Sequence, residues 1–202
     1  MRSNAMKLEL AAMALSAIGA LTVSLPTPAL ADSSVTVPAV PPDLVPETGI
    51  AFLVGHAVGT QNYICLPAGT GFAWTLFTPQ ATLFDDDDRQ IITHYFGTNP
   101  DPDDHGAIRA TWQHKDTSTI WAKAIRSSTN ENFVAKDAIP WVLLQVLHTE
   151  VGPTGGDKLF PTTFVQRLST AGGVAPATGC AQLADVGAKA FVPYTADYFF
   201  YK

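Results

Sequence analysis

Hydrophobic residues occur along this chain in short runs that are separated by glycine, proline and aspartate. Runs of this length, rich in β-branched and aromatic residues and bounded by turn formers, are typical of β-strands. We therefore expect strands over residues 50–58, 61–66, 72–77, 81–84, 91–96, 108–114, 120–125, 141–148, 162–168 and 191–201.

The regular spacing of these runs predicts an all-β fold in a single domain, an antiparallel sandwich or barrel of about nine or ten short strands. In this interpretation Gly59 and Thr60 connect two strands, and Pro79 closes another. The aromatic C-terminus, residues 198–201, must pack against the sheet because it is too apolar to remain in water. The pattern leaves the choice between sandwich and barrel open.

The first 31 residues have the features of a secretory signal peptide. Arg2 and Lys7 precede an apolar stretch over Leu8–Leu25, and Ala29-Leu30-Ala31 offers a small-residue cleavage site. The alternative is a membrane anchor, but the stretch is near the lower length limit for a span and no basic cluster follows it. The sequence therefore predicts a secreted, extracellular protein that is cleaved after Ala31.

The rest of the chain is expected to contain a proline-rich extended segment over residues 32–47 and one β domain over residues 48–202. The formal net charge is -6, which argues against a nucleic-acid partner held through phosphate contacts. No second apolar run is long enough to cross a bilayer, so we expect no membrane span after cleavage of the signal peptide.

The chain has two cysteines, Cys65 and Cys180. In an exported protein, two cysteines most simply form one disulfide. The alternative is a pair of buried free thiols. If the two residues are paired, no thiolate remains to act as a nucleophile or a metal ligand.

Several short motifs together resemble a secreted family known as domain of unknown function 3455, over about residues 48–201. Two departures stand out: Gly97–Ala110 inserts an acidic loop between the family's histidine and tryptophan, and Asp116-Thr117-Ser118 looks like the fungal branch of the family. The resemblance implies a single secreted domain with no established activity. The motifs are Gly59–Cys65, Trp74, Pro79–Phe84, His94-Tyr95, Trp112, Asp116–Ser118, Ile139–Trp141, Val165–Gly173, Ala175-Pro176, Cys180 and Val192–Phe199.

Candidate chemistry rests on few residues. There is no nucleotide-binding glycine motif, and no serine lies in a nucleophile-elbow sequence. His94, His114 and Asp116 are a candidate metal site if neighbouring strands bring them together. The alternative is that the histidines are hydrogen-bonded and partly buried, which needs no metal. We expect no cofactor.

Aromatic residues offer a second kind of site. Trp112, Trp121, Tyr95 and His94 are candidate ligand-binding residues, because aromatic rings stack on sugars and other flat ligands. The alternative, which we favour for most aromatic residues of a β domain this size, is that they belong to the core. Trp112 and Trp121 are the candidate exceptions, because the inserted loop flanks them.

The sequence thus favours a non-enzymatic secreted β domain that binds a small-molecule or carbohydrate ligand or a surface partner. One alternative is a metal-assisted hydrolase that uses His94, His114 and Asp116. Another is a structural or stress-related protein of the cell wall.

Overall fold

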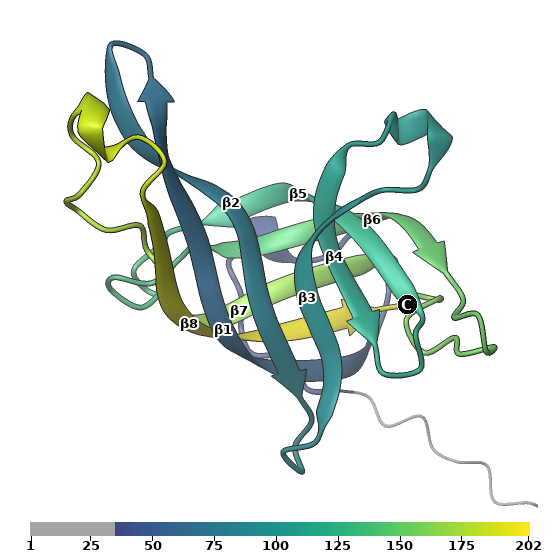
Figure 1. Cartoon of the computed structure of the whole chain (residues 1–202). Coiled ribbons are helices and arrows are strands. Elements are labelled where there is room, and N and C mark those ends of the chain that lie inside the picture. Colours follow the sequence, from purple (N-terminus) through teal and green to yellow (C-terminus); the bar gives the residue numbers. More distant parts are fainter. Residues whose placement is uncertain (1–34) are drawn as a thin grey trace, which may run out of the picture. The chain divides into compact units, whose positions relative to one another are not determined.

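The computed structural model describes residues 35–202, so the predicted signal peptide lies outside the described residues. Eight strands form one antiparallel sheet that closes on itself as a barrel (Figure 1). Each strand pairs with the next along the chain, and β8 pairs with β1. The all-β prediction is confirmed, in its barrel form. The strands are β1 (Ala51–Ala68), β2 (Gly71–Phe84), β3 (Gln90–Thr98), β4 (Ile108–His114), β5 (Thr119–Ser128), β6 (Trp141–Glu150), β7 (Phe164–Gly172) and β8 (Lys189–Tyr201).

The barrel has fewer strands than the runs predicted, because two pairs of runs are each one long strand. Gly59 and Thr60 do not form a turn and lie within β1. A Cβ added at Gly59 would lie 2.1 Å from the carbonyl oxygen of Gln80 on β2. The glycine is therefore needed for a close approach of two backbones inside a continuous strand.

Pro79 likewise lies inside β2 and does not end it. β2 pairs with β3 only from Ala81 to Phe84, so Pro79 stands where one side of β2 has no strand partner. A strand tolerates proline at such an edge position. The hydroxyl of Thr78 accepts the backbone N–H of Phe96 at 3.1 Å and joins the two diverging strands there.

The antiparallel order puts the connections after β1, β3, β5 and β7 at one end of the barrel, which we call the cavity end. The opposite end carries the β2–β3, β4–β5 and β6–β7 connections. Leu159, in the β6–β7 connection, is fully buried within the interior cluster and fills this opposite end.

Side chains pack on both faces of the sheet. The interior cluster contains Trp112, Tyr198 and Phe200, all fully or almost fully buried. A second cluster lies on the outer face of β6, β7 and β8 and includes Leu44 from the N-terminal segment. The predicted lead-in is therefore docked onto the barrel from residue 35 onward. A short helix, η1 (Pro42–Leu44), forms part of this cover.

β1 and β2 extend beyond the barrel as a hairpin at the cavity end (Figure 1). The predicted disulfide between Cys65 and Cys180 is present, with Cα atoms 5.5 Å apart, and it joins this hairpin to the β7–β8 connection. The described residues contain no helix that is long and apolar enough to cross a membrane.

Candidate ligand-binding cavity

A cavity of about 440 Å³ lies inside the barrel, and all eight strands contribute to its wall. Ile108 at the start of β4 and Lys123 on β5 are solvent-exposed and mark its mouth at the cavity end. The deeper wall is apolar and includes Val142 and Leu144 from β6. The volume falls within the range of pockets that enclose small organic molecules.

His94 and Trp112 form one wall of the cavity. They face each other across β3 and β4, and their rings stack with centroids 4.3 Å apart and planes within 10°. His94 Nδ1 lies 2.9 Å from the backbone oxygen of Thr111, which fixes the tautomer with the proton on Nδ1. Burial, with a smaller contribution from the positive charge of Arg167, lowers the pKa of His94 to about 3. The imidazole is therefore neutral at physiological pH.

Arg167 brings a positive charge into the barrel. On β7 it alternates with Gln166 and Leu168, which belong to the outer face, and it pairs in register with Tyr198 on β8. One guanidinium nitrogen donates to the backbone oxygen of Pro140 at 2.9 Å, but the buried Nε–H has no acceptor among residues 35–202. Arg167 forms no ion pair with any carboxylate in the same residues.

Two more buried donors beside the cavity lack partners in the described part of the chain: Nε2 of Gln61 and Nε1 of Trp112. The Gln61 amide lies beside the Tyr194 hydroxyl and slightly lowers its pKa, but no contact of hydrogen-bond geometry forms. The hydroxyls of Tyr194 and Tyr198 lie 3.2 Å apart. Burial raises the pKa of both tyrosines, so both remain neutral and can donate a hydrogen bond.

The four predicted ligand-binding residues divide between the two faces of the sheet. His94 and Trp112 line the cavity. Tyr95 on β3 and Trp121 on β5 both pair in register with Thr111 on β4. Their side chains therefore point to the face of the sheet opposite to that of His94 and Trp112, away from the cavity. Trp112 and Trp121, the candidate exceptions, belong to the core like the other aromatic residues, since their exposures are 0% and 8%. Trp112 is interior by strand alternation, and Trp121 packs against His148 on the neighbouring strand β6.

The comparison with known families agrees with the resemblance in the sequence. Residues 46–202 match the family model DUF3455, a protein of unknown function. The chain belongs to this family. No curated protein and no solved structure matches it.

The candidate metal residues of this DUF3455 member are not brought together as a set. His114 and Asp116 are neighbours, with Nδ1 3.0 Å from Oδ1. His114 pairs in register with Ile92 on β3. His94 lies two residues further along β3 and stacks on Trp112 instead. Within residues 35–202 there is no group of three histidine, cysteine, aspartate or glutamate side chains placed to hold a metal ion.

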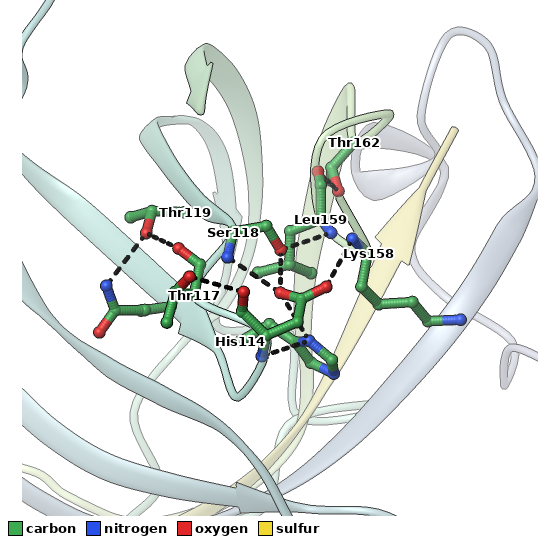
Figure 2. Close-up of polar contacts among 9 residues, drawn as sticks. His114, Thr117, Ser118, Thr119, Lys158, Leu159 and Thr162 are labelled. Atoms are coloured by element: carbon green, nitrogen blue, oxygen red, sulfur yellow. Dashed lines mark hydrogen bonds and ion pairs between the residues drawn. The ribbon is translucent and has the colours of Figure 1, made fainter. Parts of the chain in front are cut away.

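Asp116 instead joins two connections at the opposite end of the barrel. Ser118 from one connection and Lys158 and Leu159 from the other lie close together there (Figure 2). Its carboxylate accepts the Ser118 hydroxyl at 2.6 Å, the Ser118 backbone N–H at 2.9 Å and the Lys158 backbone N–H at 2.9 Å. The Ser118 hydroxyl oxygen in turn accepts the N–H of Leu159 at 3.1 Å. We call Asp116, Ser118 and their partners in the β6–β7 connection the carboxylate clamp. It holds Leu159 in the barrel.

The clamp does not have the geometry of a hydrolytic triad. Ser118 is fully buried, and its hydroxyl contacts the carboxylate and not the imidazole of His114. A nucleophilic serine needs a base that can accept its proton and a route for the substrate. The contacts of Asp116 and Ser118 instead connect the β4–β5 connection to the β6–β7 connection and stabilise the fold there.

Replacing Asp116 with alanine is expected to destabilise the barrel by about 1–3 kcal/mol, because it leaves several donors without an acceptor. Burial alone would raise the pKa of Asp116, but hydrogen bonds from Ser118, from the Lys158 N–H and from His114 outweigh it and hold the pKa below its ordinary value. The ionised carboxylate therefore adds stability that is complete above about pH 4 and is lost as the pH falls further.

Urea unfolding at pH 7 and pH 3 would measure this effect. Asp157→Ala, which removes an exposed carboxylate from the same connection, is the matched control and should change the unfolding free energy by less than about 0.5 kcal/mol. An Asp116→Ala protein as stable as the control at pH 7 would contradict the role of the clamp.

Sequence reasoning did not find Arg167 or Gln61 as cavity residues. The only signal was a charged residue in the apolar segment Val165–Leu168, and a polar residue in a strand more often faces solvent. Which side of a strand faces the interior depends on its register with its neighbours, which one sequence does not reveal.

Proposed function

We propose that this protein is a secreted barrel that binds a small organic molecule in its interior cavity. The observation that carries the proposal is a pocket of about 440 Å³ with a largely apolar wall that includes the half-buried Arg167, whose guanidinium forms no ion pair within the described residues. A charge in such surroundings favours a hydrogen-bonding partner, which a bound molecule would supply.

The architecture supports this use of the barrel. Eight-stranded barrels are wide enough to hold one small ligand. Leu159 and the carboxylate clamp fill one end, so the cavity is reached from the other. The strands that carry His94, Trp112 and Arg167 are paired on both sides, which limits the movement of these side chains.

A small molecule fits the described surface better than a polysaccharide does. Binding of a sugar chain commonly uses exposed aromatic rings as a flat platform. The two tryptophans predicted for such a platform, Trp112 and Trp121, are buried. The cavity itself lies inside the barrel, where a compact ligand fits and a sugar chain does not.

Export is the second part of the proposal. The apolar stretch Leu8–Leu25 and the site Ala29–Ala31 support a cleaved signal peptide, and the disulfide is of the kind that persists in oxidising compartments. N-terminal sequencing of protein recovered from the culture medium should begin at Asp32. Protein that stays inside the cell with an intact N-terminus would contradict export.

Filling the cavity is expected to abolish binding without unfolding the protein. Ala110 is half-buried and lines the cavity, so Ala110→Phe places a ring where the ligand would lie. A calorimetric screen of fatty acids, aromatic acids, alcohols and short oligosaccharides would first identify a binder. Ala110→Phe should weaken its binding by at least about tenfold.

Ala73→Phe is the matched control, because Ala73 is exposed on the β1–β2 hairpin and does not line the cavity. It should bind the compound as the natural protein does. If both variants bind equally well, the ligand does not occupy the barrel interior, and if no compound in the screen binds, the proposal loses its support.

A further inference from the structure

The polar groups along the cavity are mostly donors. Nε of Arg167, Nε2 of Gln61 and Nε1 of Trp112 each lack an acceptor within residues 35–202, and the Tyr194–Tyr198 pair can use only one of its two hydroxyl protons internally. Gln61 and Trp112 are 2% and 0% exposed, so their unpaired N–H groups are closed to water and to ligand atoms of similar size. The guanidinium of the half-buried Arg167 is therefore the donor that a ligand meets, and the ligand must bring acceptor atoms.

The charge of the wall has one sign. Arg167, Arg109 and Lys123 line the cavity, whereas no aspartate or glutamate in the described residues does. The charge of Arg109 is compensated, because its guanidinium bonds Asp104 at 2.5 Å and 2.7 Å. Arg167 has no such partner, and His94 is neutral. Lys123 is exposed at the mouth, so Arg167 is the cation inside the barrel that lacks a carboxylate partner among the described residues.

The remainder of the wall is apolar. Leu76, Phe96, Val142 and Leu144 surround the cavity away from the polar groups. Such side chains favour a hydrocarbon or aromatic body, since burial of apolar surface is the main source of affinity there. A ligand with a charged end and an apolar body meets both parts of the wall, whereas a cation or a free sugar meets neither.

We infer that the ligand is a small organic carboxylate with an apolar body, and that its carboxylate lies against Arg167. Carboxylates pair with a guanidinium through charge-assisted hydrogen bonds that are stronger than neutral ones. This inference rests on the proposed function, because it names the chemical class of the molecule that the cavity binds.

A matched set of probes tests the class. Hexanoate, octanoate and decanoate are titrated into the natural protein by isothermal calorimetry, each beside the alcohol and the amine of the same chain length. We expect each carboxylate to bind about 10- to 100-fold more tightly than its alcohol, and the amines to bind most weakly. 2-Naphthoate and 2-naphthalenemethanol repeat the comparison with an aromatic body.

Variants test the assignment to Arg167. Arg167→Met should reduce carboxylate affinity by about 10- to 100-fold and leave alcohol affinity within about twofold. Arg126→Met is the matched control, because Arg126 also donates to a backbone oxygen but is exposed and does not line the cavity. If Arg167→Met does not fold by circular dichroism, Arg167→Gln, which loses the charge but keeps a donor for the Pro140 backbone oxygen, should show the same selective loss.

The outcomes separate the two claims. Alcohols that bind as tightly as carboxylates would overturn the carboxylate inference and leave the proposed function standing. A preference for carboxylates that survives in Arg167→Met, or in Arg167→Gln where that variant is the one that folds, would overturn the assignment of the anion to Arg167. Binding of none of the acids, alcohols and amines would overturn the proposed function itself.

Discussion

Replacing Gly59 with alanine is expected to destabilise the barrel by about 3 kcal/mol or more. The added Cβ would lie 2.1 Å from the backbone oxygen of Gln80 and 2.5 Å from Cα of Ala81. Both atoms belong to backbone, and β1 is paired with β2 on one side and β8 on the other, so no side-chain rotation relieves the clash. The strands would have to separate opposite Ala81, where β2 ends its pairing with β3.

Gly71→Ala is the control for this prediction. Gly71 lies at the start of β2, and a Cβ added there meets nothing within 4 Å. Its unfolding free energy in urea should differ from that of the natural protein by less than about 0.5 kcal/mol. Equal stability of Gly59→Ala and Gly71→Ala would show that β1 and β2 are not in close contact at this position.

Removal of the Cys65–Cys180 disulfide is expected to cost about 2–5 kcal/mol and to lower the melting temperature by about 10 °C. The bond spans a sequence separation of 115 residues, so its loss frees a large part of the unfolded chain. It also releases the β7–β8 connection from the hairpin, where hydrogen bonds from the N–H of Cys65, the N–H of Gly187 and the indole of Trp74 would remain.

The double variant Cys65→Ala, Cys180→Ala measures this cost without a reductant. Thermal unfolding of the natural protein, with and without reductant, should reproduce the difference. Peptide mapping of the non-reduced protein should find one linked pair and no alkylated cysteine. Two alkylated cysteines, together with an unchanged melting temperature on reduction, would contradict the disulfide.

The strands could be predicted from the sequence because turn-forming residues separate the hydrophobic runs. The prediction for residues 108–114 coincides with β4, and the range 191–201 lies within β8. The errors fell on Gly59 and Pro79, which are turn formers by type but lie inside long strands here. Local propensity does not reveal that a glycine is needed for a close backbone approach, or that a proline stands beside an unpaired edge.

The candidate site was only partly readable. His94 and Trp112 were singled out as aromatic ligand contacts, and both line the cavity. Arg167 was not, because a lone arginine in a strand is usually a solvated side chain and its inward direction depends on register. The three candidate metal ligands do not lie together for a related reason. His114 and Asp116 are close in sequence and contact each other at a turn, whereas His94 lies in the barrel interior against Trp112.

The central claim is that the barrel interior binds an organic anion, and the indole proton of Trp112 reports on it directly. The chain has four tryptophans, and their indole N–H signals can be followed in ¹⁵N-labelled protein and assigned with Trp112→Phe. Nε1 of Trp141 is also buried and unpaired in the described structure, but it belongs to the outer cluster and serves as an internal control. On addition of octanoate we predict a saturable shift of the Trp112 signal alone. Saturable binding that leaves this signal unchanged, or that moves the Trp141 signal instead, would contradict the account.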